Sequence, residues 1–453
     1  MPTRRHATAI LAAMALMPNA ATAQPDFYQF QRAVVFGEPD EFATALAAIR
    51  KRGDPDMAAG LITGLRYTQG RRSAVSGVLA AITGEAEART WFDWMLWQER
   101  HPEIVPHPSY AEFKRELFIG IDPNFDVFLR SRHTRPETMR IRLEEITWGG
   151  VHKDGIPSLD NPELITAANA EYMRDDDLVF GVSINGDTRA YPLRIMGWHE
   201  MFNEVIGGVP VALAYCTLCG SGILFETKVP QLAEPLVFGS SGFLYRSNKL
   251  MFDRATHSLW NQFTGQPVSG ALVDSSIELT QRPVVIDTWA NWRKANPKTR
   301  ILSLNTGVRR DYGSGVVYHQ YFASDQLMFP ANVDESRHRQ KDYVFGVRQF
   351  GGAKAWPISA FANAPVINDA LLDRPLVLIG NAATRTARAY ERGGLSFSGD
   401  GTGVRSDDGT RWRVTEDALI AADGRSLPRV AGHIAYWFAW DGYLGATSEL
   451  YEG

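Results

Sequence analysis

Residues 180–226 read FGVSINGDTRAYPLRIMGWHEMFNEVIGGVPVALAYCTLCGSGILFE, and residues 345–391 read FGVRQFGGAKAWPISAFANAPVINDALLDRPLVLIGNAATRTARAYE. The two stretches align without a gap, 165 positions apart, and share many glycine, proline and apolar positions. Glycine and proline mark places with special backbone requirements, so this coincidence predicts one fold built twice. The shared residues include Gly181 with Gly346, Pro192 with Pro357, Asn203 with Asn368, Pro210 with Pro375 and Glu226 with Glu391.

The duplicated region has the pattern of a β-rich domain. Leu178–Ile184 and Thr188–Pro192 flank Asn185-Gly186, a pair typical of a two-residue hairpin turn. Val209–Tyr215 predicts a buried strand before the cysteine motif, and Leu193–Val205 predicts a helix. We expect the first half at about residues 147–330 and the second at about 331–453. A shared Trp-x-x-Trp pattern, followed by threonine, occurs at Trp289, Trp292 and Thr299 and at Trp437, Trp440 and Thr447.

The segment before the duplicated region is expected to be helical. Apolar residues recur there at three- and four-residue spacing in several stretches. The predicted fold class is therefore α+β: a short α-solenoid-like domain at residues 24–130, a linker at 131–146, and the duplicated β-rich domain at 147–453. The predicted helices are Asp40–Lys51, Asp56–Gln69, Ser73–Ile82, Ala88–Glu99 and Tyr110–Ile119.

The first 23 residues have the pattern of a secretory signal peptide. Arg4 and Arg5 precede an apolar run at residues 7–17, and the small residues Ala21-Thr22-Ala23 follow. We therefore expect cleavage after about Ala23 and a periplasmic or secreted protein. No later stretch reaches the roughly 18 apolar residues of a membrane span, so no integral membrane segment is expected after cleavage.

The composition excludes several classes of protein. The 453 residues include 47 basic and 51 acidic side chains, which gives a formal net charge of −4. This balance leaves no positive excess for a nucleic-acid backbone, so nucleic acid is not an expected partner. The two cysteines exclude a disulfide scaffold, and both lie in one motif, Cys216-Thr217-Leu218-Cys219.

The differences between the two copies indicate where chemistry is located. One copy carries side chains with acid–base or sulfur chemistry where the other carries inert ones. If the fold itself required these groups, the second copy should have kept them. We therefore predict one active half and one structural half. The first copy has His199 and Glu200 where the second has Ala364 and Pro365, and it has Cys216 and Cys219 where the second has Asn381 and Thr384.

The two cysteines permit three interpretations. Two thiols three residues apart can bind a soft metal ion or interconvert between dithiol and disulfide, and they can also be inert. A structural zinc site needs four ligands, and no second CxxC supplies them. Our leading interpretation is a copper(I) site with His199 as the third ligand and His257 as a further one. Zinc is the alternative metal.

Residues 253–262, DRATHSLWNQ, are dense in polar groups. Asp253 and Arg254 either bind an anionic substrate or form a structural turn network, and His257 is a candidate metal ligand or general base. The candidate catalytic residues are Cys216, His199, Glu200, Asp253 and Arg254, and the candidate metal ligands are Cys216, Cys219, His199 and His257.

Several motifs together resemble an exported bacterial family of unknown function. The resemblance covers about Thr147 to the C-terminus. It implies no activity, but because members usually have proline at the position of Thr217 and some have threonine at Cys219, it implies that Cys216 is the more important cysteine. The motifs are Trp148-Gly149-Gly150, Asp154-Gly155-Ile156-Pro157, Ala190-Tyr191-Pro192, His199-Glu200, Tyr215-Cys216-x-Leu218-Cys219 and Asp253-Arg254-x-Thr256-x-Ser258-x-Trp260.

Three functions follow from these observations. The first is a soft-metal protein with a redox or metal-handling role, in which Asp253, Arg254 and His257 surround the site. The second is a thiol-dependent enzyme with Cys216 as nucleophile and His199 as base. The third is an interaction protein, in which the helical domain binds a protein partner and the β-rich domain is a scaffold.

Overall fold

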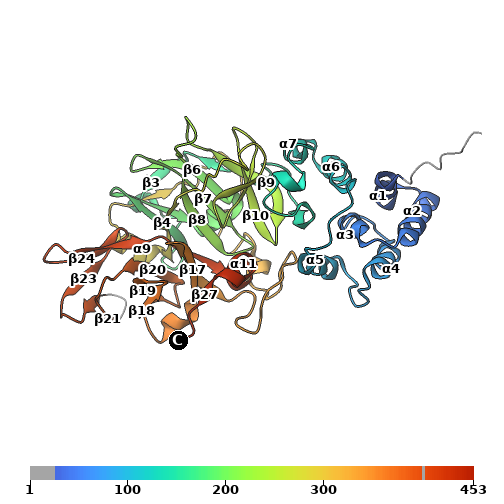
Figure 1. The fold of residues 1–453 in the computed structure, drawn as a ribbon. Helices are drawn as coiled ribbons and strands as arrows, with labels where there is room; N and C mark the ends of the chain where they lie inside the picture. Colours follow the sequence, from blue (N-terminus) through green and yellow to red (C-terminus); the bar gives the residue numbers. More distant parts are fainter. Residues whose placement is uncertain (1–25, 400–402) are drawn as a thin grey trace, which may run out of the picture.

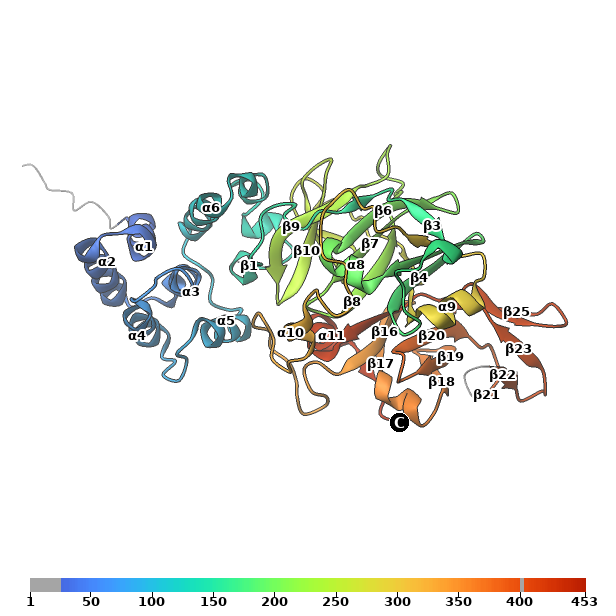
Figure 2. The same cartoon turned by 180° about the vertical axis from the view of Figure 1, so that it is seen from behind.

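The computed structural model describes residues 26–399 and 403–453, so the predicted signal peptide lies outside the described residues. A helical region lies beside a larger β-rich body, as Figures 1 and 2 show. The helices are α1 (Phe27–Phe36), α2 (Pro39–Arg52), α3 (Ala58–Leu65), α4 (Arg72–Thr83), α5 (Trp91–Arg100), α6 (Tyr110–Ile121) and α7 (Asp126–Leu129).

Local signals set the ends of these helices. A capping box between Glu38 and Glu41 opens α2, and Gly53, with φ of 69°, ends it. Four of the predicted helices are found within three residues of their expected ends. The prediction for Asp56–Gln69 is too long at its C-terminal end, because α3 ends at Leu65 and turns follow.

A buried lysine joins the helical region to the β-rich body. Lys114 of α6 donates from Nζ to the carbonyl oxygens of Leu143 and Ile146 at 2.6 and 2.5 Å. Burial lowers the pKa of Lys114 to about 7. The aromatic ring of Phe118 packs nearby against that of Phe243, so the two regions share a core.

Three sheets form the first half. One has the order β14-β4-β5-β15-β3, the next β13-β8-β7-β6-β2, and the third β1-β9-β10-β11-β12. The strands are β1 (Ile146–Trp148), β2 (Leu159–Asp160), β3 (Leu164–Thr166), β4 (Leu178–Ile184), β5 (Asp187–Pro192), β6 (Met201–Ile206), β7 (Val209–Cys216), β8 (Ser221–Glu226), β9 (Phe238–Tyr245), β10 (Asn248–Asp253), β11 (Leu259–Asn261), β12 (Gln266–Ser269), β13 (Gln281–Arg282), β14 (Val285–Thr288) and β15 (Arg300–Leu302). Two helices, α8 (Leu193–His199) and α9 (Trp289–Ala295), complete this half.

The second half has a sheet β26-β16-β17-β27 and an eight-stranded sheet β18-β19-β20-β25-β24-β23-β22-β21. Its elements are α10 (His319–Phe322) in the connection from the first half, β16 (Tyr343–Gln349), β17 (Gly352–Pro357), β18 (Val366–Leu371), β19 (Arg374–Asn381), β20 (Thr386–Glu391), β21 (Phe397–Gly399), β22 (Val404–Ser406), β23 (Arg411–Val414), β24 (Ala418–Ala421), β25 (Ser426–Val430), β26 (His433–Tyr436), α11 (Trp437–Leu444) and β27 (Glu449–Leu450).

The sheet topology confirms the predicted duplication. The order β14-β4-β5-β15 recurs as β26-β16-β17-β27, with antiparallel and parallel pairs in the same places. Gly181 pairs with Ala190 in one copy, and Gly346 pairs with Ala355 in the other. A Cβ atom at either glycine would overlap a tryptophan ring, Trp292 or Trp440, so the shared glycines make room for the shared tryptophans.

The two copies also share a side-chain bridge. Asn203 binds the backbone N–H and carbonyl of Phe238, at 2.8 and 2.9 Å. Asn368 binds the same two groups of Phe397, both at 2.7 Å. In the second half this bridge joins β18 to β21, the two edges of the eight-stranded sheet.

The prediction of a helix over Leu193–Val205 is wrong beyond His199. The helix ends at His199, Glu200 takes a left-handed conformation with φ of 54°, and the chain continues as β6. The sequence analysis did not predict the turn at Gly207-Gly208. The φ angles of these glycines, 54° and 83°, suit a two-residue hairpin turn between β6 and β7. Pairing with β7 overrides the helical periodicity of residues 201–205.

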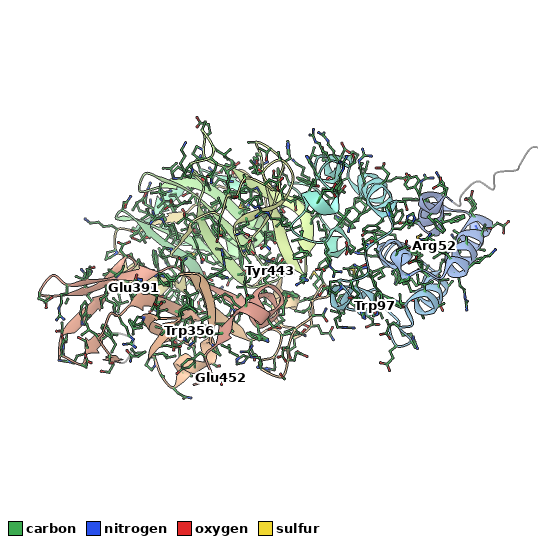
Figure 3. The ribbon with its side chains drawn as sticks, viewed as in Figure 1. Arg52, Trp97, Trp356, Glu391, Tyr443 and Glu452 are labelled. Atoms are coloured by element: carbon green, nitrogen blue, oxygen red, sulfur yellow. The ribbon has the colours of Figure 1, made fainter. Side chains whose placement is uncertain are left out.

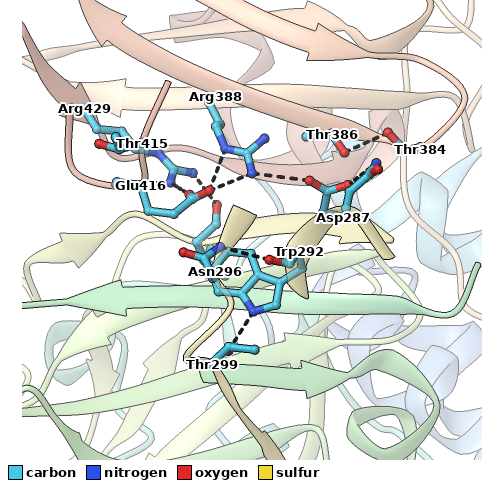
Figure 4. A network of polar contacts seen from close by, with 12 residues as sticks. Asp287, Trp292, Asn296, Thr299, Thr384, Thr386, Arg388, Thr415, Glu416 and Arg429 are labelled. Atoms are coloured by element: carbon cyan, nitrogen blue, oxygen red, sulfur yellow. Dashed lines mark hydrogen bonds and ion pairs between the residues drawn. The ribbon is translucent and has the colours of Figure 1, made fainter. Parts of the chain in front are cut away.

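A buried charge network joins the two halves (Figure 4). Arg388 of β20 donates to the Glu416 carboxylate at 2.7 Å and lies 3.4 Å from the carboxylate of Asp287, which belongs to β14 of the first half. Arg429 binds the other oxygen of Glu416. Burial alone would raise the pKa of Glu416, but the two arginines more than offset it and lower its pKa.

We expect Lys114→Met to lower the free energy of unfolding by about 2–4 kcal/mol, because two buried carbonyl groups lose their donor. Lys51→Met changes an exposed lysine of α2 and is the matched control, with an expected change below about 0.5 kcal/mol. Chemical unfolding at pH 7.5 measures both. Equal stability of the two variants would contradict the anchoring role of Lys114.

We expect Arg388→Met to destabilise the protein by about 3–5 kcal/mol, because it leaves two carboxylates without their shared cation. Arg411→Met, at an exposed arginine of β23, is the control. Since the pKa of Glu416 is lowered in the folded state, its contribution is complete above the ordinary value of 4.5 and is lost as the pH falls below it. The free energies of unfolding of wild type and Arg388→Met, measured between pH 7 and pH 3, should therefore converge as the pH falls. A difference in the free energy of unfolding that stays constant over this pH range would contradict the role given to Glu416.

Candidate functional site

The two cysteines lie side by side in a tight turn between β7 and β8. The Cys219 backbone N–H donates to the Cys216 carbonyl at 3.2 Å, and Gly220, with φ of 59°, lets β8 begin at once. The two sulfur atoms are 2.7 Å apart, and both residues are buried, with 2% and 0% of their surfaces exposed. Both are free cysteines in the structure. The sequence prediction that they form one site is consistent with this arrangement.

The start of β10 supplies a hydrogen-bond partner for the Cys219 sulfur. The Cys219 thiol donates to Asn248 Oδ1 at 2.9 Å. Burial raises the pKa of Cys219, and the neighbouring Cys216 raises it further, so Cys219 is a neutral thiol at neutral pH. Arg246 and Ser247 in the turn between β9 and β10 have φ angles of 48° and 61°, a conformation that costs energy for residues other than glycine.

Glu200 lies at the centre of a buried polar network beside the cysteine turn. Its carboxylate accepts hydrogen bonds from the Thr217 hydroxyl at 2.8 Å, from Lys249 Nζ at 3.1 Å and from the Tyr318 hydroxyl at 3.3 Å. The carboxylate therefore joins the cysteine turn to β10 and to the connection between the halves. Proline stands at the equivalent position 365, so the duplicated fold does not require this network.

Both ring nitrogens of His199 are bound to partners other than the cysteines. Its Nδ1 lies 2.9 Å from the carbonyl oxygen of Pro157, and its Nε2 lies 2.6 Å from the hydroxyl of Tyr312. A carbonyl only accepts, so Nδ1 carries the proton and Nε2 accepts from Tyr312. Burial lowers the pKa of His199, which keeps the imidazole neutral at pH 7.

No group of three or more histidine, cysteine, aspartate or glutamate side chains is placed to hold a metal ion within residues 26–399 and 403–453. The third ligand expected from His199 or His257 is thus not assembled beside the two sulfurs. Copper and zinc at the cysteine pair stay predictions from the sequence.

The polar residues after β10 form a turn network. Asp253 accepts from the backbone N–H groups of Thr256 and Ser258, at 2.6 and 3.2 Å, and from Trp260 Nε1 at 3.0 Å. The Arg254 guanidinium binds both carboxylate oxygens of Asp154, at 3.0 and 3.1 Å. This arrangement matches the structural alternative stated for Asp253 and Arg254.

His257 follows in the same loop. Its ring stacks on Phe252, with ring centroids 6.0 Å apart. The predicted roles of His257, Asp253 and Arg254 in catalysis or metal binding stay predictions.

Residues 303–342, which we call the linking segment, cover the site from one side. Three of its tyrosines contact residues of the candidate site. Tyr312 binds His199, Tyr318 binds Glu200, and the Tyr321 hydroxyl donates at 2.7 Å to the Leu218 carbonyl inside the cysteine turn. Sequence reasoning missed this segment, although its three tyrosines in a non-periodic, polar stretch were a signal.

The second half covers the site from another side. The Tyr436 backbone N–H donates to the Cys219 carbonyl at 2.8 Å, and the Tyr343 hydroxyl lies 3.0 Å from that of Tyr436. Tyr443 of α11, labelled in Figure 3 where the two halves meet, donates to the Tyr245 carbonyl at 2.6 Å. The second half therefore forms a wall of the candidate site.

The equivalent turn of the second half shows what replaces sulfur. Asn381 Oδ1 accepts from the backbone N–H groups of Ala383 and Thr384, at 2.9 and 3.3 Å. Thr384 then binds the Thr386 hydroxyl at 2.8 Å. This turn is held by local hydrogen bonds and has no redox chemistry.

Comparisons with known proteins place the chain in a family but give no activity. No curated protein and no solved structure matches the chain. In the described residues, none of the helices has both the length and the apolar character needed to span a membrane. A family described as a protein of unknown function (DUF3179) matches residues 153–447, and the chain belongs to that family.

Proposed function

We propose that the first half carries a thiol redox function, in which Cys216 and Cys219 interconvert between dithiol and disulfide. The observation that carries this proposal is the 2.7 Å separation of their sulfur atoms. A disulfide bond is about 2.05 Å long, so closing the bond needs only a small rotation of the side chains.

The reaction balances as a thiol–disulfide exchange. The thiolate of Cys216 attacks a disulfide of a reaction partner and forms a mixed disulfide, and one partner sulfur leaves as a thiol. Cys219 then attacks Cys216, which releases the second partner sulfur. Two S–H bonds of the protein are lost, one S–S bond forms, and two electrons and two protons pass to the partner. The reverse sequence oxidises a partner dithiol.

Polar groups around Cys219 support a sulfur that changes state. Ser247 Oγ and Asn248 Nδ2 are buried and have no hydrogen-bond partner in the described part of the chain. Native proteins leave few buried polar atoms unpaired, and a redox role of the neighbouring group is one explanation for such an atom. Half a turn of the Asn248 amide would present Nδ2–H to a Cys219 thiolate, which the present orientation does not stabilise.

The Glu200–Lys249 pair supports a function in this half alone. Burying two charges is costly, and the second half has Pro365 at the position of Glu200, so it lacks the carboxylate of this pair. The pair fixes Thr217, between the cysteines, against Lys249, next to the Asn248 that binds Cys219. Both residues therefore act as positioning residues for the cysteine pair.

Reaction with a partner requires the buried pair to become accessible. The linking segment is the covering part with the least regular structure, since among its residues only 319–322 form an α-helix. It is held over the site by the hydroxyl groups of Tyr312, Tyr318 and Tyr321. Local opening of this segment exposes Cys216 without unfolding either half.

Copper(I) handling is the second candidate function and uses the same two sulfurs. Two adjacent thiolates are soft ligands, which select copper(I) over harder ions. It requires the sulfurs to separate around the metal and a third ligand to be recruited, whereas the disulfide requires neither. The two functions therefore make different predictions for the purified protein.

We expect the protein, equilibrated in glutathione buffers of increasing potential, to lose two alkylatable thiols in a single reversible two-electron transition. Cys216→Ser should abolish the transition and leave one thiol. Thr384→Ser, at the position equivalent to Cys219, should leave it unchanged. Mass spectrometry after alkylation reads the thiol count. Two thiols at all potentials, or a stoichiometric metal that is lost in Cys216→Ser, would contradict the redox function, and the second result would favour copper.

We expect Tyr321→Phe to speed alkylation of the reduced pair by roughly 2- to 10-fold, because the linking segment loses one hydrogen bond of about 0.5–1.5 kcal/mol. Tyr451→Phe, which changes a tyrosine of the second half outside the site, is the control. Alkylation of native protein with iodoacetamide gives the rates. Equal rates in wild type and Tyr321→Phe would show that opening of the linking segment does not control access.

A further inference from the structure

A cavity of about 730 Å³ lies between residues 304–313 of the linking segment and the side chains of Tyr172 and Arg194. Its volume is within the range of small-molecule sites, roughly 300–1,000 Å³. It adjoins the candidate site but is separate from the cysteine pair, because neither cysteine lines it.

The lining of the cavity has an excess of positive charge. Arg194, Arg309 and Arg310 line it, against the single carboxylate of Asp311. The Arg309 guanidinium has no hydrogen bond or ion pair to any described residue and is exposed. Arg310 is also exposed, and its guanidinium lies over the ring of Trp198 at 5.7 Å. Two guanidinium groups at the cavity are therefore not neutralised by a carboxylate.

The third arginine is fixed and incompletely paired. The Arg194 guanidinium lies 3.4 Å from the carboxylate of Asp177 and 5.2 Å from the centre of the Tyr172 ring. Its Nε atom is buried and has no acceptor among the residues that the structure describes. A buried guanidinium N–H without an acceptor is costly, and with 12% of its side chain exposed, Arg194 is open to the cavity only in part.

Two hydroxyl groups that line the cavity form a hydrogen-bonded chain that ends at His199. The Tyr312 hydroxyl lies 2.6 Å from Thr306 Oγ1 and 2.6 Å from His199 Nε2, and both Tyr312 and Thr306 line the cavity. A molecule in the cavity would therefore lie next to the hydrogen bond that holds the linking segment on His199. The second half has Ala364 at the position equivalent to His199.

We propose that this cavity binds a small organic anion, with a carboxylate or phosphate group held by Arg309, Arg310 and Arg194. The planar guanidinium group matches both kinds of anion through paired N–H donors. The apolar part of the ligand would lie against Tyr172 and Leu304, which also line the cavity. This binding site stands independently of the redox function, because no step of it involves sulfur.

Calorimetric titration of the protein with inorganic phosphate and, separately, with succinate tests the site. We expect saturable binding of at least one anion to a single site. The double variant Arg309→Gln/Arg310→Gln should weaken this binding roughly 10-fold or more, because it removes two of the three guanidinium groups that would hold the anion. Both arginines are exposed, so the variant should fold, and an unchanged melting temperature verifies this.

The matched control is Arg411→Gln, which removes an exposed arginine of β23 and should leave the affinity unchanged. Binding of phosphate alone identifies a phosphate-bearing ligand, and binding of succinate alone identifies a carboxylate. The proposal is overturned if neither anion binds saturably, or if the double variant binds as tightly as wild type. Neither result would bear on the thiol titration, which reports the cysteine pair alone.

Discussion

The buried carboxylate of Glu200 connects the parts of the candidate site. It accepts hydrogen bonds from the cysteine turn through Thr217, from β10 through Lys249 and from the linking segment through Tyr318. A charge out of water is tolerated only when it is paired and fully hydrogen-bonded, and each of these three partners comes from a different segment of the chain. The left-handed backbone at Glu200 makes the contact possible, because it ends α8 and turns the chain into β6.

Duplication explains why such a costly arrangement can exist. The shared fold is maintained by features that both halves keep, such as the glycine under the tryptophan ring and the asparagine that bridges two strands. Once these requirements are met, the remaining positions are free to diverge. The second half closes its turn with local hydrogen bonds of Asn381, whereas the first half places two thiols there. The second half then serves the first as a wall, through Tyr343 and Tyr436.

The sequence predicted the parts of the structure that depend on local or repeated signals. Asn185-Gly186 located the first hairpin, and shared glycine and proline residues located the duplication. The direction of His199 could not be predicted, because its partners, Pro157 and Tyr312, lie 42 and 113 positions away in the sequence. Adjacent residues His199 and Glu200 were expected at one site. The end of α8 between them sends one toward Tyr312 and the other toward the cysteine turn.

Several energetically costly features lie around Cys219. Around Cys219 the chain has two non-glycine residues with positive φ, two buried polar atoms with no partner among residues 26–399 and 403–453, and a buried ion pair. Each of these features costs stability, and together they surround one sulfur pair. An inert pair of buried thiols would need none of them, since a small apolar environment suffices for a neutral thiol. These features are consistent with the proposed function, in which the sulfur pair changes its chemical state.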